Sequence, residues 1–187
     1  MKRIAAWIGP ALSMICLAGT AWSSAATVEA RMGYLRPNSQ DVRDVYKNGP
    51  VFGADLTVPL WKGLGLWAGA DYYHKKGKLT YTLEDTTLRV VPLFAGLKLQ
   101  SLSAKVRPYA ALAAGYFLYK ETNVIGTVSG SKVGLLGQIG LLVRITGPLS
   151  VDFHGRYTSF RNKAGETDPL TTDLGGLQGG LGLAVRF

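Results

Sequence analysis

The feature that most constrains the fold of this chain is a series of short stretches in which apolar and polar residues alternate. Eight such stretches are separated by polar or Gly/Pro-rich connections: Thr27–Arg36, Val51–Pro59, Leu64–Tyr73, Leu88–Leu99, Val106–Tyr119, Val133–Thr146, Ser150–Phe160 and Leu174–Phe187. A side-chain period of two indicates β-strands with two different faces. No stretch has a convincing helical pattern with capping residues. The sequence therefore predicts an all-β fold.

The connections between these stretches alternate in length. The long ones are Pro37–Pro50, His74–Thr87, Lys120–Lys132 and Arg161–Asp173, and the short ones are Leu60–Gly63, Gln100–Lys105 and Gly147–Leu149. Long loops at one end and tight turns at the other are typical of barrels in outer membranes. We therefore predict an eight-stranded antiparallel up-and-down transmembrane β-barrel, with four extracellular loops and both chain ends at the short-turn end.

The beginning of the chain has the pattern of a secretory signal peptide. Lys2 and Arg3 precede an apolar run from Ile4 to Trp22, and small residues follow up to Ala26. This pattern predicts cleavage after Ala25, which leaves residues 26–187 as an outer-membrane β-barrel domain. In that part, the longest uncharged runs have 12 residues. A membrane-spanning helix needs about 20 residues, whereas a spanning strand needs only about 9–11.

Charge and cysteine content exclude several function classes. The 21 Lys and Arg residues outnumber the 12 Asp and Glu residues, so the net charge is +9. A basic chain suggests a nucleic-acid partner, but we expect none for an exported membrane barrel. Cys16 is the single cysteine and precedes the expected cleavage site, so no disulfide or cysteine-based metal cluster is expected. With two histidines and no metal-ligand spacing, we expect no metal and no cofactor.

Aromatic residues gather toward the two ends of the expected strands. The strands that run toward the long loops end in Tyr34, in Tyr72 and Tyr73, in Tyr116, Phe117 and Tyr119, and in Tyr157 and Phe160. Trp61, Tyr109 and Phe187 lie at the opposite end. Aromatic girdles at both membrane interfaces are expected for a transmembrane barrel.

The charged faces of the expected strands are rich in glycine and would suit a crowded barrel interior. We predict a lumen charge network made of Glu29, Arg31, Asp55, Asp71, Lys98, Arg144, Asp152, His154, Arg156 and Arg186. Counting outward from Pro148 places Arg144 opposite Asp152, and closure of the barrel brings Glu29 toward Arg186. Because an unpaired buried charge costs several kcal/mol, these groups should compensate one another and plug the barrel. An ion or proton path with a movable salt bridge is the alternative.

Several segments resemble a family of small outer-membrane barrels. The ending Gly180–Phe187 is similar to the C-terminal signal that the barrel-assembly machinery reads, with Leu181, Leu183, Val185 and Phe187 at its alternating positions. Val91–Lys98 and Arg107–Tyr116 resemble the fourth and fifth strands of the OmpA-like/OmpX-like (opacity-type) family, and Phe153–Tyr157 has an Arg-Tyr pair where that family often carries one. The resemblance implies a porin-related protein of the Gram-negative cell envelope, located in the bacterial outer membrane.

The family includes adhesins, structural proteins and narrow channels, so the resemblance says little about function. We predict a non-enzymatic monomer that acts in adhesion or envelope integrity through its loops, with a host or envelope surface partner. Outer-membrane lipids are further expected partners, and Lys75, Lys76 and Lys78 are predicted to contact lipopolysaccharide phosphates. A narrow channel or transporter for ions or small apolar molecules is the alternative. A lipid A-modifying enzyme comes third. The residues after His154 do not match the His-x-Ser-Asn pattern that we associate with lipid A deacylases among the small barrels.

Overall fold

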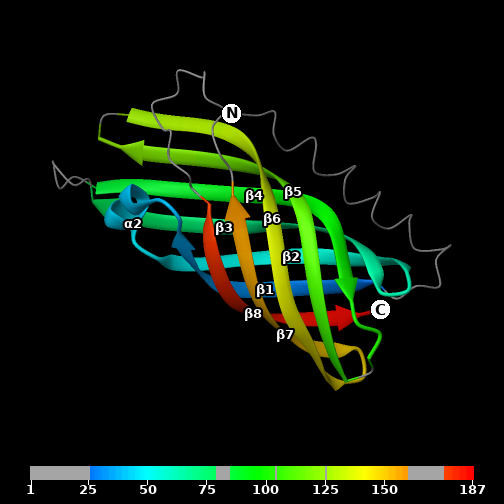
Figure 1. Ribbon diagram of the computed structural model, residues 1–187. Coiled ribbons are helices and arrows are strands. Elements are labelled where there is room, and N and C mark those ends of the chain that lie inside the picture. Colours follow the sequence, from blue (N-terminus) through cyan, green and yellow to red (C-terminus); the bar gives the residue numbers. More distant parts are fainter. Residues whose placement is uncertain (1–25, 79–84, 104, 125, 160–174) are drawn as a thin grey trace, which may run out of the picture.

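Eight antiparallel strands close into a barrel in the computed structural model, which describes residues 26–78, 85–103, 105–124, 126–159 and 175–187 (Figure 1). The strands are β1 (Thr27–Pro37), β2 (Gly49–Trp61), β3 (Leu64–Lys78), β4 (Asp85–Gln100), β5 (Val106–Asn123), β6 (Gly126–Thr146), β7 (Leu149–Ser159) and β8 (Gly176–Arg186). One short helix, α2 (Gln40–Tyr46), lies between β1 and β2. The predicted signal peptide and the loop Arg161–Asp173 lie outside the described residues. So do Phe160 and Leu174, which the sequence places in strands.

No helix in the described part of the chain is long and apolar enough to cross a membrane. Each strand pairs with its sequence neighbour, and β1 pairs with β8 from Thr27↔Arg186 to Pro37↔Gly176. The backbone N–H of Phe187 also donates to the carbonyl of Ala26 at 2.9 Å. The predicted all-β, up-and-down architecture is therefore confirmed. We call the end that carries the β1–β2, β3–β4 and β5–β6 connections the loop end, and the opposite end the turn end.

Burial alternates along the strands, and it does so most regularly on β5. Leu112 and Leu118 are 64% and 41% exposed, whereas the neighbouring Ala113 and Phe117 are 3% and 1% exposed. Large apolar side chains thus cover the outside of the barrel. Such a continuous apolar surface is expected to face lipid rather than water.

Four strands reach further toward the loop end than the sequence predicts. The connections His74–Thr87 and Lys120–Lys132 were expected to be loops, but much of each is paired strand. Lys76 faces Thr87, and Thr122 faces Thr127. These extensions are polar on both faces, so they lack the apolar alternation that marks a strand in a sequence.

The expectation that the chain has no helix is wrong for one segment. Within the connection Pro37–Pro50, α2 packs Val42 and Tyr46 against Val51 and Tyr73 inside the loop end of the barrel. In Figure 1 this helix lies beside the ends of the long strands, opposite the C-terminus. With 7 residues, α2 is shorter than most helices and too short for a clear period of 3.6.

The aromatic residues divide between the two faces of the sheet. Six of them are exposed on the outside, as girdle residues should be: Tyr34, Tyr72, Tyr116, Tyr157, Trp61 and Phe187. Tyr73, Phe117, Tyr119 and Tyr109 are instead buried in the interior. Neighbouring residues on a strand point to opposite faces, so only half of each aromatic cluster can reach the membrane interface.

Candidate functional site in the barrel interior

The middle of the barrel holds a layer of charged side chains. Successive residues of a strand point to opposite faces. Eight of the residues predicted for the lumen lie on the inward face and are buried: Glu29, Arg31, Asp55, Asp71, Lys98, Asp152, His154 and Arg156. They form two groups, one nearer the loop end around Arg31 and one nearer the turn end around Asp152.

The group nearer the loop end is built on two arginines. The Nη1 atom of Arg31 lies 2.9 Å from Oδ2 of Asp55, and its Nη2 atom lies 3.0 Å from Oδ1 of Asp71. Arg156 makes a further ion pair with Asp71. Both guanidinium groups belong to side chains that are 1% exposed. At that burial, charge-assisted hydrogen bonds are needed to offset the loss of hydration.

Gln138 on β6 joins the two groups. Its Oε1 atom accepts hydrogen bonds from Nη1 of Arg31 at 3.0 Å and from Nε of Arg156 at 2.8 Å. Its Nε2 atom donates to the hydroxyl of Tyr109 at 2.6 Å, and that hydroxyl donates to Oδ2 of Asp152 at 3.0 Å. Sequence reasoning did not include Gln138 or Tyr109 in the network, because neither carries a charge.

The group nearer the turn end pairs acids with a lysine and a histidine. Nδ1 of His154 lies 2.7 Å from Oδ2 of Asp152, and Nζ of Lys98 lies 3.6 Å from Oε2 of Glu29. The same ammonium lies 4.1 Å from the centre of the Tyr109 ring. The lysine is thus stabilised by both a carboxylate and an aromatic face.

Aromatic rings fill the space around the arginines. The rings of Trp67 and Phe94 lie 4.7 Å apart, and the guanidinium of Arg156 lies 4.8 Å from the Phe94 ring and 5.5 Å from the Trp67 ring. The Arg31 guanidinium also lies 5.5 Å from the centre of the Phe94 ring. Together with the polar contacts, these rings connect the strands β1 to β7 across the lumen.

Two predicted members of the network do not belong to it. Arg144 faces Ser150 rather than Asp152, because the turn has two residues instead of three and a bulge between Arg144 and Thr146 shifts the β6–β7 register once more. Arg186 faces Thr27 and is exposed. Glu29 accordingly pairs with Lys98 instead. The predicted pairs Arg144–Asp152 and Glu29–Arg186 are therefore wrong.

Arg107, near the start of β5, was not predicted as a lumen residue but lies inside the barrel. It is 4% exposed, and its Nη2 atom donates to the hydroxyl of Ser150 at 3.3 Å. The alternation of β5 could have revealed this position, but alanines make both faces of that strand look apolar. Arg107 adds a positive group between the network and the turn end.

Three residues of the network also have the geometry to bind a metal ion. Glu29, Asp152 and His154 each place one ligand atom within 4.8 Å of the others. No metal-ligand spacing is visible in the sequence, because Glu29 comes from β1 and the other two residues from β7. The ammonium of Lys98 already stands beside Glu29, and Tyr109 already donates to Asp152. We therefore assign the three residues to the charge network.

His154 lacks the surroundings of a catalytic base. Within the described chain its hydrogen bond is to Asp152, and Nε2 has no hydrogen-bond partner. The side chain is also 0% exposed. A general base must reach both a proton and a substrate, so the geometry gives His154 a structural place in the lumen.

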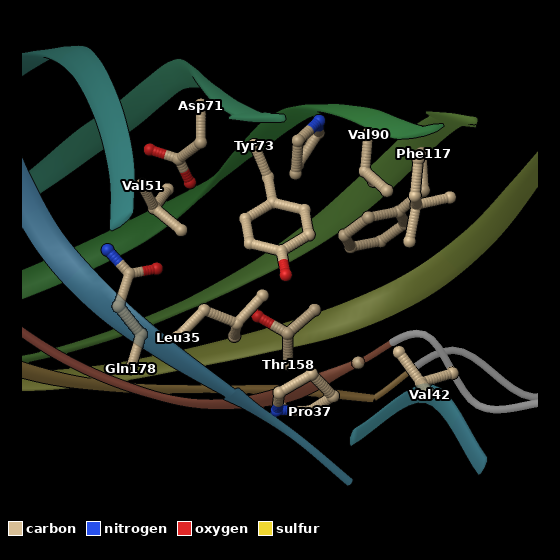
Figure 2. A pocket seen from close by; sticks show the side chains of 14 residues that line it. Leu35, Pro37, Val42, Val51, Asp71, Tyr73, Val90, Phe117, Thr158 and Gln178 are labelled. Atoms are coloured by element: carbon tan, nitrogen blue, oxygen red, sulfur yellow. The ribbon is translucent and has the colours of Figure 1, made fainter. Parts of the chain in front are cut away.

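A small apolar cavity lies between the charge network and the loop end (Figure 2). Its volume is about 40 Å³, and Asp71 and Gln178 lie at one end while Val42 of α2 lies at the other. The Tyr73 hydroxyl points into this space and has no hydrogen-bond partner among the described residues. A cavity of this size accommodates only a few water molecules. It is therefore not an open pore.

The helix α2 is held over this cavity by hydrogen bonds. The hydroxyl of Tyr46 donates to Oε1 of Glu121 at 2.7 Å and lies 2.9 Å from the hydroxyl of Thr86. Burial raises the pKa of Tyr46, so the hydroxyl keeps its proton and remains a donor. The helix thus covers the β3–β5 side of the loop end.

The remaining predicted residues lie on the outer surface, with one exception. Lys76 and Lys78 are exposed on β3, whereas Lys75 has the opposite parity and is half-buried. Leu181, Leu183 and Phe187 are exposed on the outer face of β8, and Val185 is half-buried.

Comparison with solved structures finds the same architecture. The outer membrane protein OprG from Pseudomonas aeruginosa matches with a TM-score of 0.64 at 12% identity, covering 88% of this chain and 96% of that chain. The N-terminal β-barrel domain of Pseudomonas aeruginosa OprF matches with a TM-score of 0.55 at 12% identity, covering 87% and 97%. Ail, the attachment invasion locus protein of Yersinia pestis, in complex with the heparin analogue sucrose octasulfate, matches with a TM-score of 0.54 at 17% identity, covering 88% and 97%. No family model and no curated protein sequence matches the chain.

These structural neighbours agree with the apolar outer surface of the strands and with the closed β1–β8 pairing. The chain is an eight-stranded β-barrel of the bacterial outer-membrane type, with the fold of the small OmpA-like and OmpX-like barrels.

Proposed function

We propose that this protein is a closed, monomeric barrel of the outer membrane that serves envelope integrity or surface attachment rather than transport. Its lumen is sealed by the charge network, and its loop end presents α2 and the long hairpins to the outside. The C-terminal residues Leu181, Leu183, Val185 and Phe187 serve as the signal for the barrel-assembly machinery. Any host or envelope partner would bind at the loop end.

The observation that carries this proposal is the layer formed by Arg31, Asp71, Gln138 and Arg156. Each of these residues is at most 5% exposed, and they reach one another from β1, β3, β6 and β7. An eight-stranded barrel has an interior just wide enough for side chains to fill. Mutually bonded side chains from opposite walls therefore leave no room for a hydrated solute.

Proteoliposome swelling tests the choice between a closed barrel and a narrow transporter. Vesicles that contain the folded protein should not swell in an isotonic monosaccharide or amino acid, and should behave like vesicles with the Lys62→Ala variant, whose exposed side chain lies on the β2–β3 turn. Swelling above that of protein-free vesicles would overturn the proposal and favour a transporter.

The transporter remains the second candidate because of the apolar cavity in Figure 2. Its lining would suit a small apolar molecule with one group that bonds to the Tyr73 hydroxyl. The charge network beneath it would have to rearrange before such a molecule could pass. A lipid A-modifying enzyme ranks third, because His154 is buried and no hydroxyl among the described residues is hydrogen-bonded to it.

Contact with outer-membrane lipids is a further part of the proposal. Lys76 and Lys78 are exposed on the outer face of β3, above Tyr72, where they can meet lipopolysaccharide phosphates. Lys75 points toward the interior side and is better placed to contact the region around α2.

A further inference from the structure

Three basic residues lie side by side across the outside of the barrel. His74 on β3 is paired with Arg89 on β4, and Arg89 is paired with Lys120 on β5. Lys120 is in turn paired with Ser129 on β6. All four side chains are exposed on the outer face. We call His74, Arg89, Lys120 and Ser129 together the basic row.

In the part of the chain that the structure describes, no acidic residue stands beside the basic row on the outer face. The next row toward the loop end consists of Lys76, Thr87, Thr122 and Thr127. Among the described residues, neither row contains a carboxylate. Like charges placed directly opposite each other on a sheet are destabilising, so these positions favour an anion that comes from outside the chain.

The basic row lies at the height where lipid headgroups begin. On β5, the outward residues from Pro108 to Leu118 are all apolar, and Lys120 is the first charged one. At about 3.3 Å per residue and a tilt of about 40°, this apolar stretch spans roughly 25 Å, which is the usual height of the lipid-facing band. The next row toward the turn end includes Tyr72, Val91 and Leu118. The Arg89 guanidinium lies 5.9 Å from the centre of the Tyr72 ring.

A groove joins the charged and apolar rows on β4, β5 and β6. Its volume is about 370 Å³, and its lining includes Arg89, Lys120, Ser129, Ser131, Val91 and Leu118. The Tyr116 hydroxyl donates to the Ser131 hydroxyl at 2.7 Å, which leaves the proton of Ser131 available to a ligand. The groove thus offers cations and hydroxyl donors toward the loop end and an apolar floor toward the membrane.

We propose that this groove binds one phosphate of a lipid A-type phosphoglycolipid in the outer leaflet. Arg89 and Lys120 contact the phosphate, Ser129 and Ser131 donate hydrogen bonds to the headgroup, and an acyl chain lies along Val91 and Leu118. The arrangement matches charge to charge and apolar surface to apolar surface at the correct depth. This inference rests on the outer-membrane placement in the proposed function and places the principal phosphate site on β4–β6, beside the wider lipid contact at Lys76 and Lys78.

Native mass spectrometry of the full-length folded barrel with lipid A tests the assignment. The probes are lipid A with both phosphates and the same lipid with its phosphates removed. Wild-type barrel should retain the phosphorylated lipid, and Arg89→Gln with Lys120→Gln should weaken retention at least about tenfold, which corresponds to the loss of one charge-assisted contact or more. The matched control, Lys62→Gln with Lys105→Gln, removes the same charge at the turn end and should bind like wild type.

Equal retention of the dephosphorylated lipid, or unchanged binding by the Arg89–Lys120 variant, would overturn the site. A larger loss with Lys76→Gln and Lys78→Gln would also overturn it and return the contact to β3. Different mobility of boiled and unboiled samples in SDS gels shows that each variant is folded. Swelling of proteoliposomes reports on the closed lumen independently, so the lipid site can fail without the proposed function failing.

Discussion

At the scale of single residues, the interior depends on glycine as much as on charge. An added Cβ at Gly182 would lie 2.5 Å from Oε1 of Glu29, and one at Gly53 would collide with the carboxylate of Asp71. These glycines give the large charged side chains the space to meet. A narrow lumen can hold several arginines only if its other inward positions are nearly empty.

Removing one arginine should show how strongly the network stabilises the barrel. Arg156→Ala leaves the Asp71 and Gln138 groups with fewer partners and opens space beside Phe94. We expect the free energy of unfolding to fall by about 3 kcal/mol, because a buried charge loses its partner. Urea unfolding in lipid vesicles measures this change. Arg36→Ala, at an exposed position on β1, should change the value by less than about 0.5 kcal/mol, and equal effects of the two substitutions would contradict the network.

The inward charges could be identified from the sequence because a period of two assigns each residue to a face. Arg31, Asp55 and Arg156 follow that rule, and the structure buries them. The pairings could not be derived in the same way. A bulge next to Arg144 moved the register of β6 and β7, and the bridging role of Gln138 depends on strands far apart in the sequence. Contacts across a lumen are set by the closure of the whole barrel.

At the scale of elements, the loop end differs from a set of simple loops. The strands β3 to β6 continue past the apolar band (Figure 1), and α2 lines the cavity with Val42. The sequence predicted the strands correctly where one face was apolar. It missed the extensions because they contain lysine and threonine on both faces. Their pairing is maintained by backbone hydrogen bonds, which leave no hydrophobic pattern in the sequence.

The attachment of α2 can be tested through the Tyr46 hydroxyl. Tyr46→Phe removes the hydrogen bond to Glu121 and the contact with Thr86, which should cost about 1 kcal/mol of local stability. Trypsin cleavage at Arg43 or Lys47 in the folded barrel should then become roughly fivefold faster. Tyr34→Phe is the matched control, because the Tyr34 hydroxyl makes an exposed hydrogen bond to the Asn48 carbonyl at 3.3 Å. No difference between the two variants would show that the hydroxyl of Tyr46 does not hold the helix.

At the scale of the whole molecule, the surface and the interior are inverted relative to a water-soluble barrel. Leucines and valines cover the outside, and the charges lie within. Closure of β1 onto β8 removes every free strand edge from the apolar layer, where unpaired backbone groups would be very costly. This architecture could be predicted from the sequence because alternation, loop lengths and the positions of aromatic residues such as Tyr34 and Trp61 all depend on the same membrane geometry.

The sealed lumen is the central claim, and single-channel recording in planar bilayers tests it most directly. Wild-type protein should give no steady currents, because Arg31 and Arg156 block the path between the apolar cavity and the turn end. Arg31→Ala combined with Arg156→Ala should produce currents, whereas Arg144→Ala should stay silent because Arg144 is not part of the network. Steady currents through the wild-type barrel, or a double variant as silent as wild type, would contradict the account.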